Sequence, residues 1–166
     1  MVVFPPPRVL LTISIESFVN IGNFDSKANY RDGIEIGTRD RSKLTIGKGT
    51  FFNDNVHVIS RNEIIIGKNV MVGPNVLIYD HDHDFYALDR KNTFRTAPIH
   101  IGDNVWIGGN AIILRGTIIG NNSVVGAGSV VKGRFPDNVV IAGNPAKVIK
   151  NLGRGTDCVC QTFNEK

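Results

Sequence analysis

The sequence predicts an all-β fold: a parallel β-helix of six-residue repeats in one domain, with one extended loop and a short C-terminal helix. Three observations carry this prediction. Aliphatic residues recur every six positions, small residues and glycines follow them at fixed offsets, and one polar segment interrupts the period. A length of 166 residues suits a single domain with a full core.

The repeat is clearest in the C-terminal half of the chain. A period of six fits neither the 3.6 residues of a helical turn nor the alternation of a flat strand. It fits short strands joined by tight corners, with three hexads per coil and coils stacked about 4.8 Å apart. Asparagine and glycine supply the corners, because both tolerate left-handed backbone. The aliphatic positions are Ile101, Ile107, Ile113, Ile119, Val125 and Val131, preceded by a block from Ile46 and by traces at Ile15, Ile21 and Ile36.

The ends of such a solenoid need covering. We expect residues 136–166 to form a C-terminal cap and tail, with the short helix around Ala146–Leu152. Residues 1–43 match the repeat weakly but are assigned to the same single domain, 1–166.

Composition narrows the classes of function. Hydrophobic residues make up 42% and charged residues 20%, as in ordinary globular proteins. The net charge of +4 suits an anionic small molecule, whereas no dense basic cluster indicates nucleic acid. No apolar run approaches the roughly 20 residues of a membrane span. The two cysteines, Cys158 and Cys160, exclude a disulfide framework, and we expect a cytoplasmic protein.

The interruption is the place where chemistry is expected. The period breaks between Ile78 and Ile101, and the protruding loop, 79–100, carries three of the four histidines: His81, His83 and His100. Loops that leave a solenoid are commonly functional. A histidine near its normal pKa gives or takes a proton at neutral pH, so these residues are candidates for acid–base catalysis.

Three segments resemble a known family. PNVLIYDHDHD, IGDNVWIGGNAIILRGTIIGNNSVVGAGSVVKG and PDNVVIAGNPAKVI are similar to the hexapeptide-repeat acetyltransferases, of the type that modifies galactosides, maltose and polysaccharides. The resemblance covers about residues 44 to 151. It implies a left-handed parallel β-helix, acetyl-CoA as donor, and a homotrimer with active sites between neighbouring subunits.

The resemblance also assigns acceptor-side residues. The catalytic histidine of the family lies nine residues after a proline; from Pro74 this position is His83, the expected general base. His81, Tyr79 and Asn53 are the expected acceptor contacts. The family's usual T-x-H-P ending is replaced here by H-D-H-D, so His81 stays open as the alternative base.

One acceptor-side position departs from the galactoside enzymes. Eight residues after Asn53 the family usually has an aspartate, and this chain has Arg61. A different acceptor is therefore expected.

The donor groove follows from the same resemblance. Trp106 would line the pantetheine groove, Lys147 and Lys150 suit the phosphates of the cofactor, and a lysine replaces the family's threonine near the end of the repeat. The expected acetyl-CoA residues are Trp106, Gly109, Ala127, Lys132, Lys147 and Lys150.

The prediction is an O-acetyltransferase that acts directly, in a ternary complex, on a hydroxyl of a sugar or polysaccharide precursor. An N-acetyltransferase acting on an amino sugar or nucleotide-sugar is the alternative, and a non-catalytic scaffold is a third reading. The γ-class carbonic anhydrases share the solenoid, but Gly109 and Leu114 stand where two of their zinc-binding histidines would be, so we predict no metal.

Overall fold

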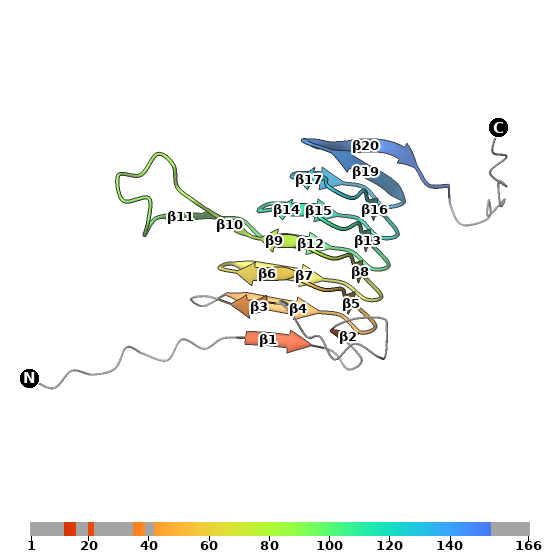
Figure 1. Cartoon of the computed structure of the whole chain (residues 1–166), viewed down its shortest axis with the longest axis horizontal. Coiled ribbons are helices and arrows are strands. Elements are labelled where there is room, and N and C mark those ends of the chain that lie inside the picture. Colours follow the sequence, from red (N-terminus) through yellow and green to blue (C-terminus); the bar gives the residue numbers. More distant parts are fainter. Residues whose placement is uncertain (1–11, 16–19, 22–34, 39–41, 154–166) are drawn as a thin grey trace, which may run out of the picture.

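The computed structural model describes residues 12–15, 20–21, 35–38 and 42–153 of the chain. In these ranges every regular element is a strand, and the strands wind into stacked coils along one axis (Figure 1). The coils comprise β1 (Thr12–Ile15), β2 (Asn20–Ile21), β3 (Glu35–Thr38), β4 (Lys43–Ile46), β5 (Phe51–Phe52), β6 (His57–Ser60), β7 (Glu63–Ile66), β8 (Met71–Val72), β9 (Leu77–Tyr79), β12 (Ile99–Ile101), β13 (Trp106–Ile107), β14 (Ile112–Leu114), β15 (Ile118–Ile119), β16 (Val124–Val125) and β17 (Val130–Val131).

Three parallel sheets form the sides of the solenoid. The first sheet runs β1-β4-β7-β12-β15-β18, where β18 is Arg134–Phe135, and the third runs β3-β6-β9-β14-β17. The second runs β2-β5-β8-β13-β16-β19-β20, where β19 is Val139–Gly143 and β20, the one antiparallel strand among the described strands of the three sheets, is Ala146–Asn151. Each coil contributes one strand to each sheet in turn, which is the three-hexad coil that the sequence predicts. The parallel β-helix is confirmed, and the weak N-terminal traces belong to it: Ile15 pairs with Ile46, and Ile36 pairs with Val58.

The core is a set of aliphatic ladders. The six aliphatic positions from Ile101 to Val131 are all buried, with at most 2% of each residue exposed. The residues four places after the first five of them are buried too, and the hydroxyls of Thr117, Ser123 and Ser129 among these form hydrogen bonds. The Thr117 hydroxyl donates to the Leu114 carbonyl at 2.6 Å, and the Ser129 hydroxyl accepts from the Gly143 amide at 3.2 Å.

Asparagine makes most of the left-handed corners. These side chains also form hydrogen bonds from coil to coil. Asn104 Nδ2 donates to Asn122 Oδ1 at 3.0 Å, and Asn55 Nδ2 donates to Asn75 Oδ1 at 2.8 Å. The corner residues combine a backbone that asparagine tolerates with a side chain that bonds to its neighbour in the stack. Asparagines with positive φ are Asn55, Asn69, Asn75, Asn104, Asn110, Asn122 and Asn138.

The glycines that follow the aliphatic positions serve a different purpose from the one predicted. Gly102 and Gly108 do not have positive φ; they are needed because the next coil lies too close for a side chain. A Cβ at Gly102 would lie 2.6 Å from Asn121 Oδ1 and 2.8 Å from the Asn121 nitrogen. Close approach of coils, more than left-handed backbone, explains these glycines.

The C-terminal cap is a hairpin of strands. After β18 (Arg134–Phe135), β19 (Val139–Gly143) turns through Asn144 and Pro145, and β20 (Ala146–Asn151) pairs antiparallel with β19. The predicted helix at Ala146–Leu152 is therefore wrong. The β-branched residues of this segment favour a strand, and pairing satisfies the exposed edge of the second sheet. None of the described residues forms a helix that could cross a membrane.

Replacing a glycine at a coil contact should destabilise the stack. We expect Gly102→Ala to lower the free energy of unfolding by about 1–3 kcal/mol, since its new methyl meets backbone that cannot move away. Gly126→Ala is the matched control at an equivalent repeat position, where the nearest atom to the methyl is the Ala142 Cβ at 3.0 Å and the nearest backbone atom is 3.6 Å away. Denaturant unfolding would contradict the stacking argument if both variants lost equal stability.

A charged ladder crosses three coils on the first sheet. Glu63 lies 3.3 Å from Lys43 Nζ and 3.4 Å from His100 Nε2. Partial burial raises the pKa of Glu63, but the hydrogen bonds and charges of Lys43 and His100 outweigh it and hold that pKa below its usual value. A lowered carboxyl pKa stabilises the fold above the unfolded-state pKa, and this stabilisation is lost as pH falls through the folded-state pKa.

Acid titration of stability tests this ladder. The stability difference between wild type and Glu63→Gln should be fully present at about pH 6 and should shrink as pH falls below about 4.5. Urea unfolding from about pH 6 to about pH 3 measures the difference. A difference that stays constant over this range would show that the Glu63 charge contributes nothing.

Candidate active site

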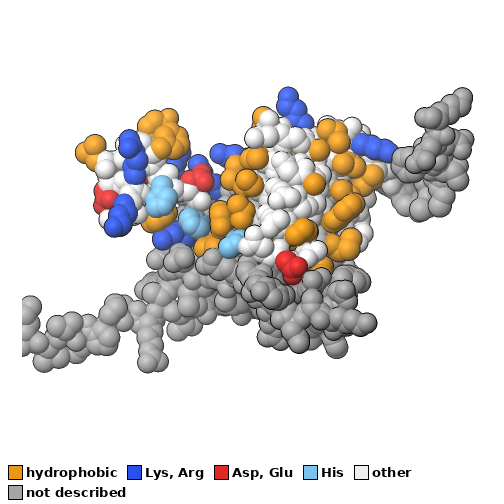
Figure 2. Space-filling view, in the orientation of Figure 1, with side chains coloured by type: hydrophobic (Ala, Val, Ile, Leu, Met, Phe, Trp, Pro, Cys, Tyr) orange, Lys and Arg blue, Asp and Glu red, His pale blue; other side chains and the backbone are white. Residues whose placement is uncertain are grey.

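The interruption forms a hairpin that leaves the solenoid. The chain departs after β9, runs out along β10 (His81–His83), returns along β11 (Phe94–Thr96) and rejoins the coils at β12. Figure 1 shows this hairpin projecting sideways from the stack, and Figure 2 shows histidine and basic side chains on its visible face. In the antiparallel register His83 lies opposite Phe94, and His81 lies opposite Thr96. Because side chains alternate along a strand, the two histidines share one face and Asp82 points to the other.

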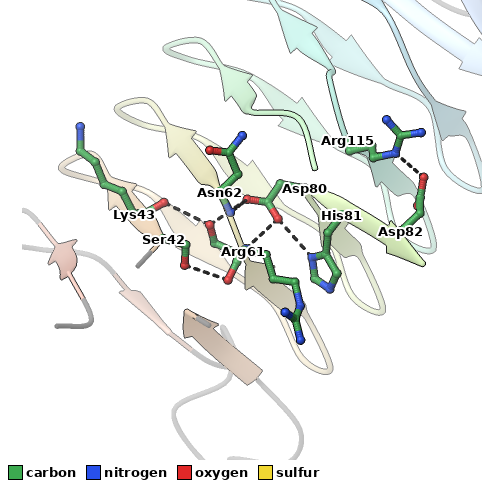
Figure 3. Close-up of polar contacts among 9 residues, drawn as sticks. Ser42, Lys43, Arg61, Asn62, Asp80, His81, Asp82 and Arg115 are labelled. Carbon is green, nitrogen blue, oxygen red and sulfur yellow. Dashed lines mark hydrogen bonds and ion pairs between the residues drawn. The ribbon is translucent and has the colours of Figure 1, made fainter. Parts of the chain in front are cut away.

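An ion pair holds the second face of the hairpin to the solenoid. Asp82 Oδ2 lies 2.5 Å from Arg115 Nε, and the Arg115 side chain is only 16% exposed (Figure 3). Arg115 directly follows β14, in the coil above the point where the hairpin leaves. The base of β10 is therefore fixed relative to the coils.

A buried carboxylate marks the start of the hairpin. Asp80 is fully buried and accepts hydrogen bonds from the Ser60 hydroxyl at 2.9 Å and from the Arg61 and Asn62 amides at 2.8 Å (Figure 3). Its Oδ1 also lies 3.1 Å from His81 Nδ1. A buried carboxylate requires such donors. Asp80 therefore ties the hairpin to the turn that follows β6 and orients the His81 ring.

His83 is oriented by the backbone of its own hairpin. Its Nδ1 lies 2.7 Å from the Arg90 carbonyl oxygen, and the side chain is exposed. A carbonyl oxygen only accepts, so Nδ1 carries the proton in this contact. In the neutral ring, Nε2 then has the free lone pair. The geometry presents a histidine with one nitrogen anchored and the other available as a base.

Phe94 joins the residues of this face, and sequence reasoning did not identify it. Its ring centroid lies 4.4 Å from that of His83 and 6.0 Å from that of His81, and the Arg61 guanidinium carbon lies 3.6 Å from it. The Tyr79 ring lies 6.0 Å from His81. The structure thus brings Tyr79, His81 and His83 together. The segment F-R-T alternates as H-D-H does, but the sequence does not fix the register that places Phe94 opposite His83.

Other predicted residues lie along a different corner, between the second and third sheets. A Cβ at Gly109 would lie 3.2 Å from Pro74 of the coil below, and the Gly128 amide next to Ala127 donates to the Gly109 carbonyl at 3.0 Å. At the same corner, Asn53 Oδ1 accepts from the Asp54 amide at 2.7 Å, which is a turn contact. This corner and the hairpin are at opposite ends of the third-sheet strands.

The aromatic and basic residues predicted for the donor groove, Trp106, Lys147 and Lys150, share the outer face of the second sheet. Trp106 is 51% exposed. The register aligns it with Val124, then with Val140, then with Lys150 of β20. Lys147 pairs with Ala142 and lies on the same face. Lys132 follows β17, at the corner above the hairpin, and is exposed.

The described residues contain no group of three or more histidine, cysteine or acidic side chains arranged to hold a metal ion. Cys158 and Cys160 lie outside the described residues.

Comparison with known proteins identifies the family to which the repeat belongs. Residues 98–133 match the family described as bacterial transferase hexapeptide (six repeats). A putative lipopolysaccharide biosynthesis O-acetyl transferase of Escherichia coli K12 is 35% identical over 149 residues, which are 82% of this chain and 76% of the relative. The galactoside O-acetyltransferase of the same organism is 41% identical over 112 residues, or 67% of this chain; the chain spans just over half of that relative, 55%.

Solved structures give the same result. A hexapeptide-repeat acetyltransferase of Vibrio cholerae, crystallised with acetyl coenzyme A, superposes with a TM-score of 0.70 and 29% identity. The match covers 86% of this chain and 72% of that one. The chain therefore belongs to the hexapeptide-repeat acetyltransferase family.

Proposed function

We propose that this acetyltransferase moves the acetyl group of acetyl-CoA to a hydroxyl of a sugar or polysaccharide precursor, with His83 as general base. The observation that carries the proposal is the contact of His83 Nδ1 with the Arg90 carbonyl, which leaves Nε2 free on an exposed ring. The similarity to an enzyme named for lipopolysaccharide biosynthesis supports a glycan acceptor.

The proposed reaction uses the free nitrogen of His83 as the base. His83 Nε2 removes the proton of the acceptor hydroxyl as its oxygen attacks the thioester carbonyl carbon. The tetrahedral intermediate then collapses, the carbon–sulfur bond breaks, and the sulfur leaves with the proton that His83 returns. A sugar hydroxyl is a weak nucleophile at neutral pH, and a positioned base contributes typically 10²- to 10⁴-fold. Holding both substrates together supplies much of the remainder.

His81 is the competing base, and its environment differs. Its Nδ1 faces the buried Asp80 carboxylate, and only 16% of its side chain is exposed. His83 is the more accessible of the two and lies farther out on the hairpin. We therefore assign proton transfer to His83 and an acceptor contact to His81 and Tyr79. The same base would serve an amine, so an amino sugar or nucleotide-sugar is the alternative acceptor.

The donor is proposed to lie along the outer face of the second sheet. Trp106 would contact the pantetheine arm near Gly109 and Ala127, while Lys147 and Lys150 would meet the phosphates. Supporting this, Trp106 and Lys150 occupy one row of the sheet. Lys132 lies at the corner above the hairpin, so its contact with the donor depends on the route of the cofactor.

A homotrimer with sites between subunits is the proposed assembly. In one chain, the hairpin with His83 and the corner with Gly109 and Ala127 are separated by the length of the third-sheet strands. A neighbouring copy that places its corner against this hairpin would bring base and donor together. Cyclic packing of a three-sided solenoid is consistent with this arrangement. The cytoplasmic location also stays a prediction.

Loss of the base should abolish turnover without abolishing donor binding. We expect His83→Ala to lower kcat by at least about 10²-fold, because the acceptor hydroxyl keeps its proton. Thiol release from acetyl-CoA, measured across sugars, amino sugars and nucleotide-sugars, gives the rate and names the acceptor. Isothermal calorimetry with acetyl-CoA should show unchanged affinity.

Two further variants complete this experiment. His100→Ala, a histidine outside the proposed site, should retain wild-type turnover. His81→Ala should lose less activity than His83→Ala; the reverse order would transfer the role of base to His81. Failure of the wild-type protein to bind acetyl-CoA would overturn the donor assignment.

Mixing two inactive variants tests the shared site. Ala127→Trp should block the donor corner of its own chain, and His83→Ala removes the base. If sites form between copies, trimers reassembled from an equal mixture should regain activity at roughly a quarter of their interfaces. If each site lies within one chain, the mixture should remain as inactive as its components.

A further inference from the structure

Resting on the proposed function, we infer that Phe94 is a positioning residue for His83, and that Arg61 holds Phe94 in place from the solenoid. Nothing in the spacing of the repeat indicates this role. It follows from the ring contacts on the histidine face of the hairpin.

Two contacts restrict the orientation of the His83 imidazole. The hydrogen bond from His83 Nδ1 to the Arg90 carbonyl, 2.7 Å long, restrains the ring at one atom. Small rotations about the side-chain bonds of His83 still change the direction of Nε2. The Phe94 ring lies against the imidazole with centroids 4.4 Å apart and planes at 39°. An aromatic face at this distance restricts these rotations. Together, the two contacts fix the direction in which Nε2 points.

Phe94 is held in turn by an arginine of the solenoid. Phe94 belongs to the hairpin and is half-buried. The Arg61 guanidinium lies 3.6 Å from its ring centroid, within the range of a cation–π contact. Arg61 itself belongs to the solenoid, and its backbone amide donates to the buried Asp80 carboxylate at 2.8 Å. Contacts therefore run without a break from the rigid coils to the imidazole.

The attachment of the hairpin to the solenoid does not depend on Phe94. The opposite face of the hairpin is held independently by the pair of Asp82 and Arg115. Loss of the Phe94 ring therefore leaves the hairpin anchored while it releases the imidazole. A change of this kind should reduce the rate of proton transfer and leave substrate binding intact, because a misplacement of about 1 Å costs up to roughly 10²-fold in rate.

The test is a set of substitutions at the ring and at its clamp. For Phe94→Leu we expect kcat to fall by about 10- to 10²-fold, with KM for acceptor and for acetyl-CoA within about twofold of wild type. Phe94→Tyr keeps the aromatic face and should restore kcat to within about threefold. Arg61→Lys, which lacks the planar guanidinium, should fall between these two. Phe85→Leu, an exposed aromatic on the same hairpin, is the matched control and should match wild type.

Several results would overturn the inference. Wild-type kcat in Phe94→Leu would show that the ring does not position the base. A raised KM for acceptor with unchanged kcat would make Phe94 an acceptor contact, and equal losses in Phe94→Tyr and Phe94→Leu would remove the aromatic face from the explanation.

A spectroscopic measurement keeps the inference separate from the proposed function. In wild type, the His83 imidazole resonances should carry the ring-current shift of Phe94 and the pattern of a protonated Nδ1; the shift should disappear in Phe94→Leu. If no acceptor gives turnover, the proposed function fails, and the His83 resonances alone test whether Phe94 positions the ring. His83 resonances that do not change in Phe94→Leu would overturn the positioning role of Phe94.

Discussion

Backbone hydrogen bonding between successive coils is the constraint on which the rest of the structure depends. The Gly67 amide donates to the Ile101 carbonyl at 2.8 Å, and the Gly102 amide donates to the Ile119 carbonyl at 2.9 Å. This spacing must hold at the corners as well as in the strands. It excludes side chains where coils touch most closely, which explains the glycines. It also leaves corner amides that need acceptors, and asparagine and aspartate side chains of the next coil supply them: Asp103 accepts from the Lys68 amide at 2.8 Å.

The same constraint explains how the hairpin can leave the stack. Where the chain departs after β9, the amides of Arg61 and Asn62 in the coil below would lose their partners. Asp80 accepts from both, just as Asp103 accepts from an amide at another corner. A buried amide without an acceptor costs free energy, so the departure requires a side chain of this kind. The carboxylate that repairs the stack also faces His81, and it fixes the turn that carries Arg61. Asp80 therefore serves both the hydrogen bonding of the solenoid and the geometry of the candidate site.

Periodicity made most of the fold predictable, because every hexad repeats the same local physics. The aliphatic ladder from Ile101 to Val131, the coil of three hexads and the position of the hairpin follow from the sequence alone. The segment from Ala146 to Leu152 was predicted wrongly as a helix, because its β-branched residues were given too little weight and the open sheet edge that they pair with is a feature of the tertiary structure. In the candidate site, His81 and His83 were predictable from the interruption of the period, and Tyr79 was predicted from the family resemblance. Phe94 was not, because its contact with His83 depends on a hairpin register set by tertiary structure.

A solenoid core filled by buried aliphatic side chains has no interior space for substrates, so chemistry must occur on outer faces, corners and outgrowths. A two-stranded hairpin is only marginally stable alone. Its precision must therefore come from side chains that reach it from the coils, and two arginines do so: Arg115 on one face and Arg61 on the other. The hairpin residues beyond the reach of Arg61 and Arg115 make little contribution to the stability of the stacked coils. Under the proposed function, substitutions there would change the acceptor contacts while the repeat and the proposed donor face remain intact.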